Sequence, residues 1–393
     1  MSVFGMVSSV AGFIKVRYLV DKALIDNMVF RAHYRVTSAI LFLCCIIVTA
    51  NNLIGDPIQC INDRGVPGHV INTYCWITYT FTLPHEQGKR VGTEVAHPGL
   101  GNENQEKTYH SYYQWVPFVL FFQGVMFYVP HWIWKNWENG KIRMITEGMR
   151  GSMVGVGEKQ EREHRQYRLV QYLMETLHMH TSYAFGYFFC EALNFVNVMV
   201  NIFMTDKFLG GAFLTYGTDV VAFSNMNQEN RTDPMVQVFP RVTKCTFHKF
   251  GPSGTIQTHD ALCILALNIL NEKIYIFLWF WFIILAVLSG LAIVYSAAVV
   301  LLPSTRETIL KRRFRFGVPN AVETIIRKTQ VGDFLLIHLL GQNTNQLVFS
   351  EILDEFVRRL NFGNSNSNLP SAPSTLEISP IYPEIEKFKE TDA

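Results

Sequence analysis

The sequence predicts an all-α membrane protein whose chain crosses the bilayer four times. Four stretches are apolar over about 20 residues, the length that spans a bilayer. Lys and Arg gather on one side of these stretches, which orients the protein in the membrane. Four of the seven cysteines lie on the opposite side, in the two segments that we expect outside the cell.

The chain divides into segments that follow from this pattern. The fourth apolar stretch contains no Asp, Glu, Lys or Arg, and the third contains only Glu191. The final segment is rich in Asn, Ser and Pro, a composition that does not build a core, so we expect it to be disordered. The expected boundaries are 1–35 for an N-terminal helix and cytoplasmic lead-in, 36–54 for the first span, 55–114 for extracellular loop 1, 115–134 for the second span, 135–182 for a helical cytoplasmic loop, 183–205 for the third span, 206–273 for extracellular loop 2, 274–302 for the fourth span, 303–360 for a helical cytoplasmic region and 361–393 for the tail.

The distribution of basic residues places both termini in the cytoplasm. Five Lys and Arg residues precede the first span, and eight lie between the second and third spans. Loop 1 instead has four basic against six acidic residues, and loop 2 has six of each. Because Lys and Arg are retained in the cytoplasm, both loops are extracellular. The basic run Lys311-Arg312-Arg313-Phe314-Arg315 after the fourth span is expected to rest on anionic inner-leaflet lipids.

The extracellular cysteines predict disulfides. Cys60 and Cys75 lie in loop 1, and Cys245 and Cys263 lie in loop 2. Their spacings do not match zinc motifs, and thiols on an oxidising face form disulfides. Pairing within each loop is the simpler connectivity, but pairing between the loops remains open. Residues 74–81, rich in Thr, Tyr, Ile and Trp, predict a strand beside the first pair.

The remaining cysteines, Cys44, Cys45 and Cys190, lie in spans and are expected to be free. Polar residues also mark one face of the third span. Helical spacing brings together Tyr183, Tyr187, Glu191, Asn194, Asn197 and Asn201. Such a face either lines an aqueous pathway or supplies hydrogen bonds between helices, and the second interpretation is the commoner one.

Two further residues have two interpretations each. Pro117, near the start of the second span, either kinks that helix or is tolerated in its first turn. Asn230 in the sequon Asn230-Arg231-Thr232 lies in extracellular loop 2, where a glycan would hinder contact with another surface.

Several other classes of protein find no support in the sequence. A net charge of +2 does not favour nucleic acid as a partner. The pair Gly140-Lys141 is followed by Ile142, so it does not form a phosphate-binding loop, and neither a metalloprotease helix nor a nucleophile elbow occurs. We therefore expect no enzyme, no catalytic residue, no metal and no cofactor.

Short motifs match a known family over residues up to about 360. The pentapeptide Tyr112-Tyr113-Gln114-Trp115-Val116 stands at the mouth of the second span. Other matching runs are Gly55-Asp56-Pro57 with Cys60, Thr73-Tyr74-Cys75-Trp76, Cys190-Glu191-Ala192-Leu193-Asn194, KCTFHKFGPSG from Lys244, and Asn271-Glu272-Lys273. In these motifs the chain resembles the innexins, the gap-junction proteins of invertebrates. The tail motif PSAPSTLE from Pro370 resembles the third innexin paralogue of insects.

The resemblance implies a protomer of a large-pore channel, with short β-strands in its disulfide-stapled extracellular loops. By this resemblance, eight subunits would surround an aqueous pore and form a hemichannel. The subunits would be copies of this chain alone or a mixture with other innexins. Hemichannels of adjacent cells would dock in the plasma membrane at cell junctions and pass ions and small molecules. An N-terminal helix would enter the pore mouth through Ser2, Val3, Phe4, Met6 and Phe13.

Two alternatives remain beside this hypothesis. The first is an undocked hemichannel that releases solutes, which a glycan on Asn230 would favour. The second is a non-conducting adhesion or scaffold partner of another innexin.

Overall fold

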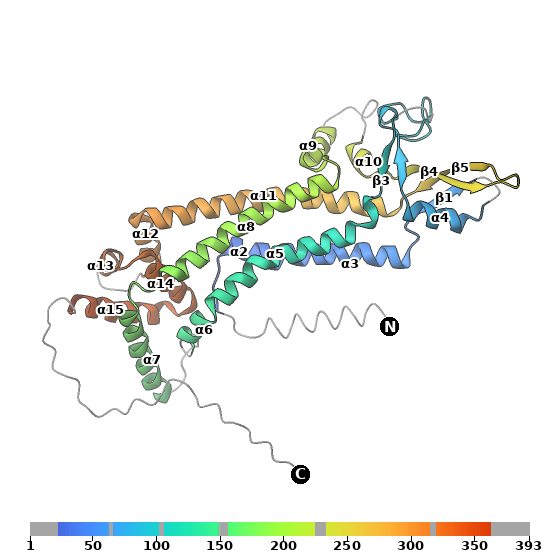
Figure 1. Cartoon of the computed structure of the whole chain (residues 1–393). Coiled ribbons are helices and arrows are strands. Elements are labelled where there is room, and N and C mark those ends of the chain that lie inside the picture. The colour runs from blue at the N-terminus through green and yellow to red at the C-terminus, as the bar shows by residue number, and fades with distance from the viewer. Residues whose placement is uncertain are drawn as a thin grey trace, which may run out of the picture.

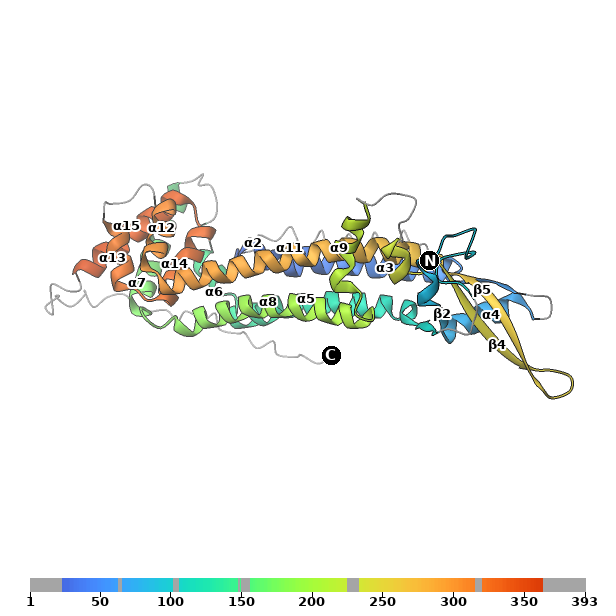
Figure 2. The same cartoon turned by 90° about the horizontal axis from the view of Figure 1, so that it is seen from above.

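Four long helices run side by side in an elongated bundle, with a small sheet at one end and a group of shorter helices at the other (Figures 1 and 2). This computed structural model describes residues 23–62, 66–101, 106–147, 149, 156–224, 233–314 and 320–362. The expected N-terminal helix and the sequon lie outside the described residues, as does the tail beyond residue 362.

The prediction of four membrane-spanning helices is confirmed, because four helices are long and apolar enough to cross a bilayer. The first span, Met28–Ile54, is assembled from three pieces, and each of the others is one continuous helix. The elements are α2 (Met28–Arg31), the π-helix η1 (Ala32–Thr37), α3 (Ser38–Ile54), α5 (Val116–Glu138), α8 (Thr181–Phe208) and α11 (Leu267–Leu301). At 35 residues, α11 is longer than a bilayer needs, so it extends beyond the apolar core.

The outer surface of the bundle remains apolar. Side chains such as Leu43 on α3, Phe121 on α5 and Val287 on α11 are exposed in the isolated chain. Large apolar surfaces of this kind are stable against lipid tails or against neighbouring helices but not in water. The bundle is therefore built for a membrane and leaves faces open for other subunits.

The two prolines of α5 occupy different places. Pro117 lies in the first turn, where the missing N–H has no partner in any helix, so this proline is tolerated there. Pro130 lies inside the same helix and removes one interior backbone donor. Of the two interpretations of Pro117, the structure supports tolerance. The interior proline, Pro130, was not among the features predicted from the sequence.

A helical domain caps the end of the bundle that lies opposite to the sheet (Figure 1). Its elements are α6 (Lys141–Thr146), α7 (Val156–Glu175), α12 (Pro303–Arg313), α13 (Ala321–Lys328), α14 (Val331–Asn343) and α15 (Gln346–Phe362). Phe334, Phe349 and Leu353 lie in its core, which is continuous with the inner ends of the spans. The guanidinium of Arg359 lies 4.3 Å from the ring centre of Tyr167 and so joins α15 to α7.

The opposite end holds strands and short helices from the two loops that the sequence predicts to be extracellular. These elements are β1 (Gln59–Asn62), α4 (Gly68–Ile77), β2 (Thr80–Thr82), η2 (Pro84–Glu86), β3 (Thr108–His110), η3 (Tyr112–Gln114), α9 (Phe213–Ser224), α10 (Pro234–Val238), β4 (Val242–Phe250) and β5 (Ile256–Ile264). The strand expected at residues 74–81 is wrong for most of its length, since α4 runs to Ile77. Ile71 and Cys75 are fully buried and four residues apart, so packing of one helical face overrides the β-favouring composition.

One tight contact joins this helical domain to the third span. The carboxylate of Asp333 on α14 accepts hydrogen bonds of 3.1 Å from the backbone N–H groups of His178 and Gln330. Nδ1 of His180 lies 3.0 Å from the same carboxylate. Burial alone would raise the pKa of Asp333, but these hydrogen bonds outweigh burial and hold that pKa below its usual value.

Gly332 makes this contact possible. A Cβ on Gly332 would lie 2.3 Å from the carbonyl oxygen of His180, closer than any side-chain carbon approaches backbone. Only glycine therefore lets α14 reach the residue that immediately precedes α8.

We predict that Gly332→Ala lowers the thermal stability of the purified protein, by about 1–3 kcal/mol, because the added methyl group pushes α14 away from His180. Thermal unfolding in detergent measures the effect. Gly68→Ala is the matched control, since a Cβ on Gly68 meets nothing within 4 Å. Equal melting temperatures for the two variants would show that the contact at Gly332 is not tight.

Candidate functional site: the cap built by two loops and the polar face of the third span

The two loops that the sequence predicts to be extracellular build one sheet, and we call this sheet together with α4 the cap. The strand order is β1-β5-β4-β2-β3, and every pairing is antiparallel. Loop 2 supplies the central hairpin β4–β5, while loop 1 supplies the strands on both sides of it. Neither loop forms this sheet alone, so each loop completes the other.

Two disulfides fix the loops to one another. Cys60 on β1 is bonded to Cys263, which faces it directly on β5. Cys75 on α4 is bonded to Cys245 on β4. The simpler pairing within each loop is therefore wrong, because the register of β1 against β5 sets Cys60 opposite a cysteine of the other loop.

The disulfides form the centre of a small core. Cys75, Cys245 and Cys263 are buried together with Ile71 and Tyr113. The Sγ atoms of Cys60, Cys75 and Cys263 lie within 4.8 Å of one another, so the two bonds are neighbours. Sulfur held in a disulfide is not a thiolate, so this cluster does not offer the ligands that zinc needs.

The pentapeptide at residues 112–116 anchors the cap to the second span. The hydroxyl of Tyr113 donates to the carbonyl oxygen of Cys75 over 3.1 Å, and the side-chain amide of Gln114 donates to the carbonyl oxygens of Trp76 and Ile77. Burial raises the pKa of Tyr113 to about 12, so its hydroxyl stays a donor. Tyr112 donates to the carbonyl oxygen of Val238 on α10. Of the other two residues of the pentapeptide, Val116 is fully buried and Trp115 is exposed.

A charged pair anchors the cap to the fourth span. The guanidinium of Arg241, just before β4, donates to both carboxylate oxygens of Glu272 on α11, with distances of 2.9 and 3.0 Å. The carboxylate of Glu272 is almost fully buried, and paired donors of this geometry are a strong way to satisfy it. Asn268 adds a bond of 2.7 Å to the carbonyl oxygen of Pro240. The cap is thus attached to two spans by polar contacts.

The hairpin β4–β5 projects beyond the other elements of the cap (Figure 2). Phe250 and Ile256 are paired across its tip, and both are largely exposed. The turn between them closes with a bond of 2.8 Å from the N–H of Gly251 to the carbonyl oxygen of Thr255. An exposed apolar pair at the end of a rigid hairpin is a feature of surfaces that bind a partner.

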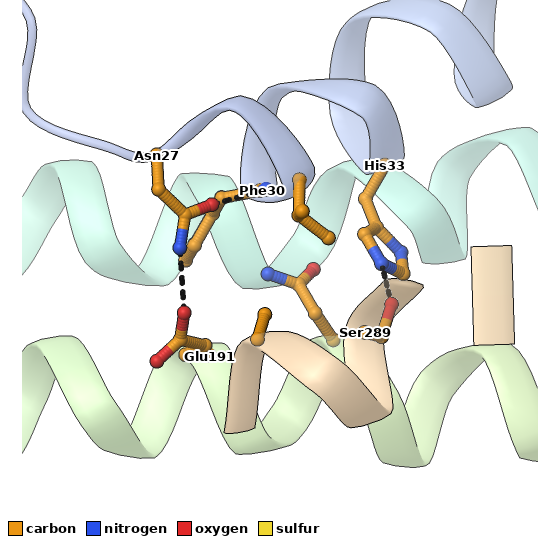
Figure 3. Close-up of a pocket in the computed structure, with 8 residues that line it drawn as sticks. Asn27, Phe30, His33, Glu191 and Ser289 are labelled. Atoms are coloured by element: carbon orange, nitrogen blue, oxygen red, sulfur yellow. Dashed lines mark hydrogen bonds between the residues drawn. The ribbon is translucent and has the colours of Figure 1, made fainter. Parts of the chain in front are cut away.

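The polar face of α8 lies inside the bundle. Glu191, Asn194, Asn197 and Asn201 are all buried. One carboxylate oxygen of Glu191 accepts a bond of 2.6 Å from the amide of Asn27, and the other accepts from the hydroxyl of Ser296. Figure 3 shows the Asn27 side chain pointing at Glu191. This arrangement favours the interpretation as hydrogen bonds between helices over that of a wall of an aqueous pathway.

The same row of buried polar side chains continues toward the end of the bundle that carries the cap. The amide of Asn201 donates to the carbonyl oxygen of Asn197 over 2.8 Å, one turn away on the same helix. Near the end of α8, the amide of Gln123 on α5 donates to the hydroxyl of Thr205 over 2.7 Å. Buried amides in a membrane protein commonly serve as such links between helices.

The other predicted site residues divide into two groups. Among the residues that the structure describes, Cys44, Cys45 and Cys190 are free thiols, as expected. Ser2, Val3, Phe4, Met6, Phe13 and Asn230 lie outside the described residues. Sequence reasoning missed Asn27, Ser296 and Arg241. Asn27 could have been found as an Asn just before an apolar helix, the position of an N-cap, whereas nothing in the sequence links Arg241 to Glu272.

We predict that non-reducing peptide mass spectrometry will recover Cys60 linked to Cys263 and Cys75 linked to Cys245. Cys60→Ser and Cys263→Ser should lower the melting temperature equally, by an amount equivalent to about 2–4 kcal/mol, and the double variant should lower it no further. Recovery of a peptide that links Cys60 to Cys75 would contradict the connectivity.

Comparison with known proteins agrees with the motifs. The innexin family model matches residues 26–360. Innexin inx3 of Drosophila melanogaster is 63% identical, and the match covers 100% of both chains, which confirms the resemblance to the third insect paralogue. Innexin inx2 of Schistocerca americana is 47% identical over 91% of this chain and 98% of its own length. Innexin inx4 of Drosophila melanogaster is 31% identical over 86% and 93%. The chain belongs to the innexin family.

Proposed function

We propose that copies of this chain, eight to a ring, enclose an aqueous pore as a hemichannel, and that hemichannels of adjacent cells dock through their extracellular caps. Innexins are gap-junction channel subunits, so the chain is a multi-pass membrane protein of gap junctions that assembles with other innexin subunits. The proposal adds the number of subunits, the docking surface and the orientation of the termini.

The observation that carries the proposal is the joint cap. Two loops separated by two spans share one sheet and are held by two disulfides across them. A rigid cap presents the same surface from every subunit of a ring, which lowers the entropy lost when two rings dock. A loop that served only to connect spans would need neither the sheet nor the disulfides.

Compartment chemistry supports the orientation. Disulfides form in oxidising compartments, so the cap lies outside the cell. The helical domain at the other end contains the segments between the second and third spans and after the fourth span, which are rich in Lys and Arg, and such segments are retained in the cytoplasm. Both termini then lie inside the cell, and the basic segment after α11 faces the inner leaflet.

The pore is formed between subunits rather than within one. The polar face of α8 is buried inside the protomer, while apolar side chains on α3, α5 and α11 face outward. Neighbouring subunits and lipid would cover these outward faces, and the N-terminal residues that precede α2 would line the pore mouth. No catalytic residue takes part, because the solutes diffuse passively.

We expect paired cells that express this chain, alone or with a second innexin, to show junctional current in dual voltage clamp. Solute uptake by single cells without junctional current would instead support an undocked hemichannel. The absence of both would support a scaffold role.

The cysteines provide a matched set for this assay. Cys245→Ser should abolish junctional current, because it removes the bond that holds α4 against β4. Cys44→Ser, on the first span and free, is the control and should leave the current close to that of the unchanged protein. Surface biotinylation separates loss of docking from loss of delivery to the membrane.

The hairpin tip should be needed for docking alone. We predict that Phe250→Ser with Ile256→Ser lowers junctional conductance at least tenfold and leaves single-cell hemichannel current unchanged, since both side chains are exposed at the tip. Val91→Ser, which changes an exposed extracellular side chain away from the hairpin, is the control. Full junctional conductance in the double variant would rule out the tip as a docking surface.

The sequon Asn230-Arg231-Thr232 favours the undocked hemichannel as a second candidate function. A glycan on loop 2 would keep two caps apart. Asn230→Gln should then create junctional current where the unchanged protein has none.

A further inference from the structure

A small pocket lies where the start of the first span meets α8 and α11 (Figure 3). Asn27, His33, Glu191, Asn194 and Ser289 contribute its polar lining. It offers a volume of about 10 Å³. That is close to the smallest space that admits one water molecule and too little for a larger ligand.

The hydrogen bonds around His33 fix the state of its ring. The hydroxyl of Ser289 donates its single proton to the carbonyl oxygen of Leu285 over 2.6 Å. The same hydroxyl oxygen lies 2.6 Å from Nε2 of His33, so Nε2 must be the donor in that contact. In the neutral ring, Nδ1 is then an acceptor. It is buried and meets no hydrogen-bond donor among the residues that the structure describes.

Asn194 presents a second unsatisfied group to the pocket. Its side chain is 3% exposed, and within the described ranges neither its amide nitrogen nor its amide oxygen has a partner. Burial of an amide without hydrogen bonds is unfavourable, because the amide loses its bonds to water and nothing replaces them. Two unsatisfied side chains on different helices thus line one pocket of the size of a water molecule.

We propose that this pocket is a binding site for one water molecule that bridges His33 of the first span to Asn194 of the third. The water donates one proton to Nδ1 of His33 and uses its other proton or a lone pair to bond the amide of Asn194. A metal cation fits these groups less well, since it cannot accept from an amide N–H. Both oxygens of Glu191 already accept from Asn27 and Ser296.

The water would stabilise an irregular stretch of the first span. His33 belongs to the π-helix η1, whose wider turn breaks the regular backbone pattern of the helix. Trp281 holds the far end of this turn by a bond of 2.9 Å to the hydroxyl of Thr37. The water would hold its near end, and the first span would be joined to α8 at both Asn27 and His33.

A density map of the assembled, full-length channel tests the proposal directly. At a resolution where ordered waters are visible elsewhere in the protein, a peak should lie within about 3.2 Å of both Nδ1 of His33 and the amide of Asn194. A map with other waters but no peak there overturns the proposal.

Thermal unfolding of Asn194→Leu gives a second test, because a pocket that binds water and a dry pocket predict opposite changes in melting temperature. If the water is bound, leucine displaces it and leaves Nδ1 of His33 without a donor, so the melting temperature falls. If the pocket is dry, leucine fills a void and removes an unsatisfied amide, so the melting temperature rises, and the proposal fails. Asn197→Leu calibrates the loss of one hydrogen bond, since Asn197 accepts from Asn201 and does not line the pocket.

Discussion

The covalent bonding of the two cap loops to each other is the constraint on which the rest of the structure depends. Cys60–Cys263 and Cys75–Cys245 connect points 203 and 170 residues apart. They hold β1 and α4 against the central hairpin. The polar contacts of Tyr113 and Arg241 then fix α5 and α11 relative to the cap. One set of span ends is therefore positioned by the cap, and the opposite set is positioned by the helical domain.

Between these two ends the bundle separates polar from apolar groups in a way that suits lipid. Apolar side chains cover the outside, while amides and a carboxylate meet in the middle. Glu191 is tolerated there because Asn27 and Ser296 donate to both of its oxygens. Asn27 also caps the first span by accepting from the N–H of Phe30, so one side chain fixes the start of that helix and joins it to α8.

Much of this fold could be predicted from the sequence, and the rest could not for physical reasons. The length of an apolar stretch and its lack of charged residues are local properties of the sequence, so the four membrane-spanning helices could be predicted. The spacing of Glu191 and Asn194 likewise predicted a shared face. The disulfide connectivity depends on the register of β1 against β5, which no spacing encodes. Residues 74–77 favour strand by composition, yet the burial of Ile71 and Cys75 on one side made a helix. Ser296, which donates a hydrogen bond to Glu191, is too distant in the sequence for this contact to be predicted from a local pattern.

The order of synthesis gives the connectivity of the cap a further consequence. Cys60 leaves the ribosome long before Cys263, and at about 5–20 residues per second those 203 residues take roughly 10–40 s. In the orientation proposed above, the thiols of loop 1 face an oxidising lumen during that time, with only each other as partners. The nascent chain must either be kept reduced or later exchange a wrong Cys60–Cys75 bond. The native disulfides of the cap can therefore form only after the third span and the hairpin β4–β5 have been synthesised.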